Sequence, residues 1–184
     1  MKTTRTIKTT RTIAVVSGAL FLLAGSAAFA AKSVKVTMNT VTAEGVGKSI
    51  GTITIKAAKD GVTIEPKLKG LAPGEHGFHL HEKPDCAPAE KDGKMTAAQS
   101  AGGHFDPDAT KAHKGPGGGG HKGDLPKLVV SDKGEAKDKL EVKGLTLADF
   151  QGKSLMIHEG GDNYSDTPKP LGGGGGRIAC GVVK

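Results

Sequence analysis

The sequence predicts an all-β domain, built as an antiparallel sandwich or barrel. Apolar residues alternate with polar ones over several short runs, as in half-buried strands. Glycine, proline and aspartate separate these runs, and no window shows the apolar stripe of an amphipathic helix. Several short strands with turns between them are typical of the two architectures. The alternating sets are Val34/Val36/Met38, Ile53/Ile55, Val62/Ile64/Pro66/Leu68, Leu140/Val142, Leu155/Ile157 and Ile178/Cys180/Val182.

The first 30 residues have the three parts of a secretory signal peptide. Four basic residues and no acidic ones precede a mostly apolar run from Ile13 to Ala24, and small residues follow up to Ala30. The apolar run is too short for a permanent membrane span. Ser26 stands where a lipoprotein would carry its lipidated cysteine. We therefore expect cleavage after Ala30, no membrane anchor, and one mature domain over residues 31–184.

The mature domain carries little net charge. Four of the 26 basic residues belong to the signal, which leaves 22 basic against 19 acidic residues, a balance of +3. Aromatic residues make up 3% of the chain and tryptophan is absent, so few side chains could stack on bases. We expect no nucleic-acid partner.

Two cysteines, Cys86 and Cys180, occur in a chain that is predicted to be exported. An oxidising compartment makes a disulfide between them the expected state. It would close a loop of about 95 residues, which the chain-entropy model values at no more than about 4–5 kcal/mol. Two free buried thiols are the alternative.

Two long segments, residues 82–127 and 160–176, show little strand pattern. Loops of this length are uncommon in a compact domain unless they have a function. All seven histidines lie between His76 and His158, in or beside these segments. Imidazole-rich sets suit copper and zinc better than calcium or magnesium. The distribution of histidines therefore predicts a metal site.

His79 and His81 lie two residues apart on a predicted strand and therefore share a face. Phe78 and Leu80 point the other way. If this apolar pair faces the core, the two imidazoles project together from the outer face. His76 has the parity of Phe78, which predicts a structural histidine rather than a metal ligand.

The first long loop carries three imidazoles and one carboxylate within 21 residues. Such a set can close a four-coordinate zinc site. A solvated polar loop is the alternative, but it does not explain why the histidines gather there. The residues are His104, His113, His121 and Asp124, and His158 ends another strand-like run.

Five blocks of the sequence closely resemble copper–zinc superoxide dismutases of the bacterial periplasmic type. The resemblance covers essentially all of residues 31–184. It implies a flattened eight-stranded Greek-key β-barrel, an immunoglobulin-like sandwich with two long functional loops. It also implies a periplasmic antioxidant enzyme that converts superoxide to molecular oxygen and hydrogen peroxide. The blocks are residues 74–81 (GEHGFHLH), 101–107 (AGGHFDP), 120–126 (GHKGDLP), 156–164 and 172–183.

The same resemblance implies one copper and one zinc ion per subunit. His104 would belong to both metal sites, bridging the ions as an imidazolate and carrying a proton during turnover. All the ligands of the family are present. The copper ligands would be His79, His81, His104 and His158, and the zinc ligands would be His104, His113, His121 and Asp124.

Three further roles follow from the resemblance. Asp162 matches a carboxylate that accepts hydrogen bonds from one copper and one zinc histidine. Arg177 matches the arginine that binds the anionic substrate near copper, so Arg177 and His104 would be the catalytic residues. The Cys86–Cys180 disulfide would tie the first loop to the last strand and hold Arg177 in place. Without the resemblance, Asp162 would be interpreted as an ordinary turn residue and Arg177 as a surface arginine.

Superoxide is the expected small-molecule partner. Related bacterial enzymes are often dimers, so a homodimer stays open, although the sequence identifies no interface. One alternative function is a non-enzymatic periplasmic metal buffer or chaperone, which would leave Arg177 and Asp162 unexplained. Another is an inert β-sandwich that acts as an adhesin or binds carbohydrate. Sugar sites commonly use tyrosine or tryptophan, and Tyr164 is the only such residue here.

Overall fold

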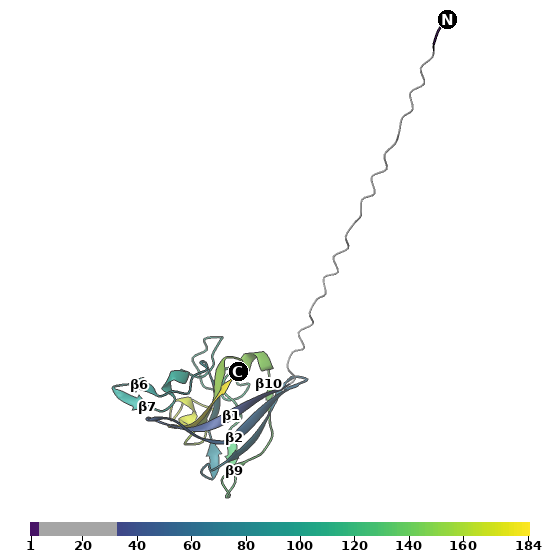
Figure 1. The fold of residues 1–184 in the computed structure, drawn as a ribbon. Helices are drawn as coiled ribbons and strands as arrows, with labels where there is room; N and C mark the ends of the chain where they lie inside the picture. The colour runs from purple at the N-terminus through teal and green to yellow at the C-terminus, as the bar shows by residue number, and fades with distance from the viewer. Residues whose placement is uncertain (4–32) are drawn as a thin grey trace. The chain divides into compact units, whose positions relative to one another are not determined.

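The computed structural model describes residues 1–3 and 33–184 (Figure 1). Beyond its first three residues, the predicted signal peptide lies outside the described residues, as does the cleavage site after Ala30. The regular structure of residues 33–184 is almost entirely β. In the described part of the chain, no helix is long and apolar enough to cross a membrane.

The strands are short and closely spaced along the chain. They are β1 (Ser33–Thr42), β2 (Gly45–Ala58), β3 (Gly61–Lys69), β4 (Gly74–His76), β5 (Phe78–His81), β6 (Ala89–Lys91), β7 (Lys94–Thr96), β8 (Leu128–Val130), β9 (Glu135–Ala136), β10 (Leu140–Lys143), β11 (Lys153–His158) and β12 (Arg177–Val183). One α-helix, α1 (Leu147–Phe150), and two 3-10 turns, η1 (Gln99–Ala101) and η2 (Leu171–Gly173), complete the described elements.

The main strands form one curled antiparallel sheet. The largest sheet has the order β10-β3-β2-β1-β12-β11-β5, and β9 also pairs with β3. Strand β4, just before β5, pairs with β8, and the β8–β9 turn is closed by a 2.9 Å hydrogen bond from Ser131 N to Glu135 O. Consecutive strands β3 and β4, and likewise β10 and β11, are not neighbours in the barrel. The predicted eight-stranded Greek-key arrangement is confirmed.

The predicted alternation identifies the core of the barrel. On β3, Val62, Ile64, Pro66 and Leu68 are buried, while the residues between them are partly or fully exposed. Strand β5 turns Phe78 into the same core. Each side chain of this size stabilises the fold by roughly 1.5–3 kcal/mol when it is fully buried.

The last strand differs from the simple pattern. Ala179 and Val183 of β12 face the main core. Cys180, which the alternation grouped with Ile178 and Val182, lies in a second apolar cluster. The first long loop covers the outer side of β12, so apolar residues occur on both of its faces. The two-residue alternation therefore predicts the strand correctly. It cannot show which face packs in the main core, because both faces are covered.

A β-bulge interrupts β12 near its N-terminal end. Ile157 of β11 pairs with Ala179, but the next residue, His158, pairs with Arg177. Ile178 is therefore the extra residue, and it packs against the main core. Because a bulge changes the direction in which its neighbours point, it helps to aim Arg177 outward.

The first long loop contains a hairpin that the alternation of apolar residues does not predict. Strands β6 and β7 pair around Asp92 and Gly93, which both have positive φ angles, 52° and 76°. A two-residue Asp-Gly turn of this kind is among the strongest local signals for a hairpin. The signal was present, but the short flanking strands carry too few alternating apolar residues to support it.

Candidate metal centre

Strand β5 places two histidines on the outer face of the barrel. Phe78 and Leu80 point into the core, and His79 and His81 point away from it, as the parity predicted. The two imidazoles are nevertheless buried, with 0% and 1% of their residue surface exposed. The loops that follow the strand cover them.

The first loop folds back along the free edge of β5. Phe105 N donates to Leu80 O at 2.8 Å, and Leu80 N donates to the carbonyl of Gly123 at 2.9 Å. These bonds set His104 opposite His81 and Asp124 opposite His79. A side chain at position 123 would collide with the carbonyl of Leu80, so only glycine allows this approach. Residues that lie far apart in the chain thereby reach one site.

The second loop brings His158 and Asp162 to the same site. Gly77 N donates to Gly160 O at 2.7 Å, and His158 N donates to Gly77 O at 2.8 Å. Part of the glycine run 172–176 is needed for close packing here. A side chain at Gly172, which has a φ of 70°, would collide with the Asp162 carboxylate.

His76 lies beside this site but does not join it. Its Nδ1 is 2.7 Å from the carbonyl oxygen of His158, and its Nε2 is 2.8 Å from that of Ala72. Both ring nitrogens are therefore engaged by the backbone, as a structural histidine requires.

The side chains gather into two clusters that share His104. We call them the four-histidine cluster and the histidine–aspartate cluster. Within each cluster, one potential ligand atom per residue lies within 4.8 Å of the others. The four-histidine cluster consists of His79, His81, His104 and His158, and the histidine–aspartate cluster consists of His104, His113, His121 and Asp124. The structure thus brings together all the predicted metal ligands, whose coordination of copper and zinc stays a prediction.

The four-histidine cluster has the unpaired donor atoms that a metal ion needs. One nitrogen of each ring is held from outside: His81 Nδ1 by Gly102 O at 3.0 Å, and His158 Nδ1 by Gly175 O at 3.3 Å. The opposite nitrogen of each ring is buried without a hydrogen-bond partner. These atoms are Nδ1 of His79 and Nε2 of His81, His104 and His158. Four buried imidazole lone pairs without partners fit a bound copper ion.

The histidine–aspartate cluster is organised around one carboxylate oxygen. Asp124 Oδ1 lies 3.0 Å from His104 Nδ1, 2.9 Å from His113 Nδ1 and 3.3 Å from His121 Nδ1. The contact with His113 is out of line for a hydrogen bond, so this nitrogen is also buried without a partner. Three imidazole nitrogens and one carboxylate oxygen this close together fit a zinc ion, which takes four such ligands.

Asp162 connects the outer sides of the two clusters. One carboxylate oxygen accepts a hydrogen bond from His79 Nε2 and the other from His113 Nε2, both at 2.8 Å. The carboxylate is buried, and Tyr164 N donates to it at 2.7 Å. These bonds leave Nδ1 of each ring facing the interior of its cluster. The predicted position of Asp162 between two histidines is therefore observed.

Burial keeps the four-histidine cluster uncharged. Desolvation lowers the pKa of His104 to about 4 and that of His158 to about 3. It also lowers the pKa of His79 and His81, although the Asp162 hydrogen bond partly offsets the effect on His79. At neutral pH these rings are neutral and can act as metal ligands.

The histidine–aspartate cluster has the opposite electrostatic character. Burial alone would lower the pKa of His113, but contacts with the carboxylates of Asp124 and Asp162 raise it to about 9. Burial works to raise the pKa of Asp124, but His104 and His113 hold it well below its usual range. The carboxylate is therefore ionised and available to a cation.

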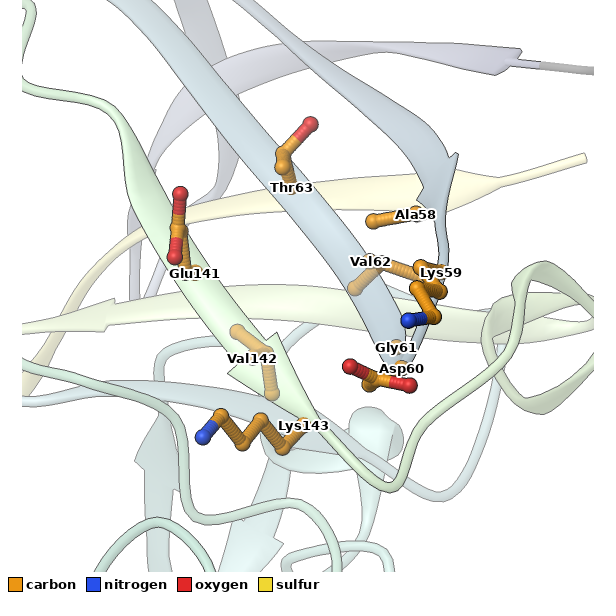
Figure 2. Close-up of a pocket in the computed structure, with 9 residues that line it drawn as sticks. All are labelled: Ala58, Lys59, Asp60, Gly61, Val62, Thr63, Glu141, Val142 and Lys143. Atoms are coloured by element: carbon orange, nitrogen blue, oxygen red, sulfur yellow. The ribbon is translucent and has the colours of Figure 1, made fainter.

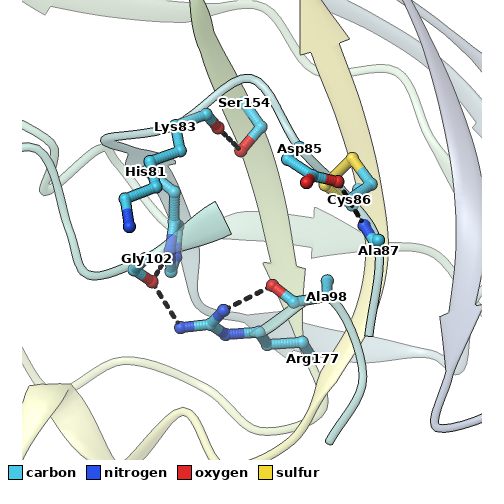
Figure 3. Close-up of a disulfide and its surroundings, with 10 residues drawn as sticks. His81, Lys83, Asp85, Cys86, Ala87, Ala98, Gly102, Ser154 and Arg177 are labelled. Carbon is cyan, nitrogen blue, oxygen red and sulfur yellow. Dashed lines mark hydrogen bonds between the residues drawn. A yellow bond between two sulfur atoms is a disulfide. The ribbon is translucent and has the colours of Figure 1, made fainter. Parts of the chain in front are cut away.

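Arg177 is fixed by the loop that carries His104. Its guanidinium donates to Ala98 O at 2.6 Å and to Gly102 O at 2.7 Å (Figure 3). The carbonyl of Gly102 also accepts the bond from His81, so the arginine and this histidine are held by one group. Two of the five guanidinium N–H groups are used in this way, and the others can bind an anion.

The predicted disulfide between Cys86 and Cys180 is present (Figure 3). It joins the first loop to β12, three residues beyond Arg177. Cys86 and Cys180 pack together with Ala98, whose carbonyl holds the arginine. The bridge therefore supports the loop segment on which Arg177 depends.

The barrel and its paired clusters define a β-barrel metalloprotein with an arginine next to its metal-binding residues. Comparison with known sequences identifies which one. Residues 49–183 match the family described as copper/zinc superoxide dismutase. The chain belongs to the copper/zinc superoxide dismutase family.

Individual relatives agree with this assignment. A copper-zinc superoxide dismutase of Escherichia coli K12 is 57% identical over 155 residues, which are 84% of this chain and 90% of the relative. The copper/zinc superoxide dismutase from Brucella abortus aligns with a TM-score of 0.81 at 49% identity, covering 83% of this chain and 99% of that one. The monomeric copper, zinc superoxide dismutase from Salmonella enterica aligns with a TM-score of 0.73 at 55% identity, with the same coverage.

Proposed function

We propose that the protein dismutates superoxide to molecular oxygen and hydrogen peroxide, with copper in the four-histidine cluster and zinc in the histidine–aspartate cluster. The observation that carries this proposal is the set of buried ring nitrogens without partners. Such nitrogens are costly to bury unless a metal ion completes them. The family to which the chain belongs and the names of its relatives support the same metals and reaction.

The ligand atoms follow from the hydrogen bonds. In the four-histidine cluster they are His79 Nδ1 and the Nε2 atoms of His81, His104 and His158, because these nitrogens have no other partner. In the other cluster they are Asp124 and the Nδ1 atoms of His104, His113 and His121. When bound, copper supplies the one-electron oxidation and reduction of superoxide.

Arg177 binds the substrate anion. Its charge lies close enough to contribute to the lowered pKa values of His81 and His158, although desolvation is the main cause of both. A superoxide ion that contacts the free N–H groups of Arg177 is therefore held next to the four-histidine cluster. The two backbone carbonyls keep the guanidinium from turning away into solvent.

His104 would hold either the metal ion or a proton at Nε2, one at a time, and would deliver that proton to the product. Its Nδ1 faces Asp124, and its Nε2 faces the four-histidine cluster. A proton taken up at Nε2 after the first superoxide is oxidised passes to the peroxide that forms from the second. The second proton comes from water.

We also propose that residues 1–30 direct export to the periplasm and are removed after Ala30, which leaves a mature chain without a membrane anchor. N-terminal sequencing of the periplasmic fraction tests the cleavage, and an intact N-terminus there contradicts it.

A homodimer is tested by the mass of the mature protein in solution. The Salmonella enterica relative is named monomeric, so a monomeric mass would match it and exclude the homodimer.

The proposed activity is tested with protein loaded with one copper and one zinc ion. Superoxide consumption, followed after pulse generation of the radical, should be fast and should fall as salt increases. The Arg177→Ala variant should bind both metals normally and react at least about tenfold more slowly, a size typical of electrostatically steered enzymes, among them superoxide dismutases themselves. Its salt dependence should be weaker.

The Arg177→Lys variant serves as a control, because it keeps the charge but loses the fork that bonds Ala98 and Gly102. It should recover part of the rate and most of the salt dependence. A fully loaded wild-type protein that leaves superoxide untouched would refute the proposed function.

A further inference from the structure

The histidine–aspartate cluster has one partly exposed member. His104, His113 and Asp124 retain 6%, 1% and 2% of their accessible surface. The side chain of His121 is 10% exposed, and its residue is not buried. An ion that enters this cluster from solvent therefore meets His121 first.

A groove of about 250 Å³ opens next to His121. One wall is the glycine-rich part of the first loop, and the other is the end of β10 with the turn that follows it. Asp124 and His121 both line the groove, and His121 is the one whose side chain solvent reaches. Its charged and ring-bearing side chains are Asp108, His121, Lys122, Asp124 and Lys143.

Another hollow, of about 200 Å³, also borders Lys143 (Figure 2). It lies between the β2–β3 hairpin and β10. The charged residues around it are Lys59, Asp60, Glu141 and Lys143, and no histidine lines it. Of these two hollows, only the first leads to proposed zinc ligands.

A pair of opposite charges lines the groove. Lys122 Nζ is 3.8 Å from Asp108 Oδ2, and their side chains are 43% and 62% exposed. An exposed pair at this distance is weak and opens easily. A hydrated dication in the groove is attracted by Asp108 and repelled by Lys122, so the two residues act on its approach in opposite directions.

We propose that Zn(II) enters and leaves the histidine–aspartate cluster through this groove, with Asp108 drawing the ion in and Lys122 slowing its entry. The proposal rests on the zinc assignment made under the proposed function. In this proposal, Asp108 and Lys122 do not bind the ion once it has reached the cluster. They set the rate at which it arrives, as charges at the rim of a binding site commonly do.

The test measures zinc uptake by the zinc-free, disulfide-bonded protein, with copper already bound in the four-histidine cluster. Zinc is delivered from a weak chelating buffer, and its transfer is followed by stopped flow with a zinc-sensitive dye. Asp108→Asn should slow uptake and Lys122→Gln should speed it, each by about two- to fivefold at low salt. Both effects should shrink as the ionic strength rises. The final zinc content should be one ion per chain in every variant.

Matched controls separate the groove from the overall charge of the protein. Asp132→Asn and Lys133→Gln make the same charge changes in the exposed β8–β9 turn, away from the groove. Neither should alter the uptake rate by more than a small fraction. Rates for the two groove variants that match these controls would overturn the proposal.

A steric variant tests the route itself. Lys143→Gln removes a positive charge from the groove and should speed uptake, whereas Lys143→Trp removes the same charge but adds bulk and should slow it. Equal rates for these two variants would show that zinc enters elsewhere. A wild-type protein that binds no zinc would refute the zinc assignment, and full zinc content with unchanged rates would refute the groove alone.

Discussion

The two clusters of the centre share one histidine but differ in how their interior nitrogens are held. In the four-histidine cluster, the interior nitrogens have no polar partner, and desolvation keeps every ring neutral. In the histidine–aspartate cluster, the nitrogens surround an ionised carboxylate, and His113 keeps a proton with a pKa of about 9.

This difference has a consequence for metal binding. The four-histidine cluster is neutral and preformed, so a metal ion enters it near neutral pH without displacing a proton. The other cluster offers a negative charge but must first release the proton of His113. Metal affinity in the two clusters should therefore depend on different residues and respond differently to pH.

Replacing a histidine that belongs to only one cluster should produce the largest difference in metal content between the two clusters. His158→Ala removes a ring from the four-histidine cluster, and His121→Ala removes one from the other. Loss of an outer hydrogen-bonding partner typically costs about 10- to 100-fold in metal affinity, and loss of a ligand should cost more. Elemental analysis should find copper reduced in the first variant and zinc in the second. Equal loss of both metals in each variant would remove the distinction.

Replacement of Asp162 should affect both clusters to a smaller extent. Asp162→Asn leaves one acceptor oxygen for the two N–H groups of His79 and His113. Affinity for both metals should fall by about 10- to 100-fold, as measured by competition with chelators of known strength. Asp166→Asn is the control, because Asp166 accepts bonds only from the backbone N–H groups of His113 and Leu171. A copper affinity unchanged by Asp162→Asn would show that Asp162 serves one cluster only.

The pH dependence of zinc affinity sharpens the contrast further. Because the pKa of His113 is raised to about 9 in the metal-free protein, its proton competes with zinc below that pH. Zinc affinity should fall by about tenfold per pH unit from pH 9 toward 6.5. Copper affinity should stay nearly flat over that range, because burial lowers the pKa of His104 to about 4. Parallel slopes for the two metals would contradict the assignment of this proton.

The same protonation states predict the stability of the metal-free fold. A raised pKa at His113 stabilises the fold fully below pH 6.5, and this contribution is lost as the pH rises through 9. The lowered pKa values of His104 and His158 contribute stability above pH 6.5 that is lost as the pH falls toward 4 and 3. Urea unfolding of the metal-free protein between pH 4 and 10 should therefore show losses at both ends. Their absence at alkaline pH would argue against a protonated His113.

Sequence patterns predicted the parts of the site that regular structure positions. Strand parity placed His79 and His81 together on the outer face, and it separated His76 from them. The gathering of histidines in one loop indicated a second set of ligands. Such arguments succeed because a strand has a fixed period and because unpaired imidazoles are costly to bury.

Other parts required a resemblance or the structure. Asp162 is one acidic residue in a turn, and nothing local shows that it bridges two rings. Arg177 depends on a bulge at Ile178 and on carbonyls from a distant loop, which no periodicity encodes. The β6–β7 hairpin has an Asp-Gly turn, but its strands are too short to show an alternating pattern. These features arise from long-range contacts or from short local signals rather than from extended patterns.

The copper and zinc contents of the His104→Ala variant test the shared centre most directly. His104 contributes a nitrogen to each cluster, so its loss should lower both metals in the same sample, while His158→Ala chiefly lowers copper. A circular dichroism melt confirms that each variant is folded. If the folded His104→Ala protein retained one copper and one zinc ion per chain, the two clusters would not be joined through this ring.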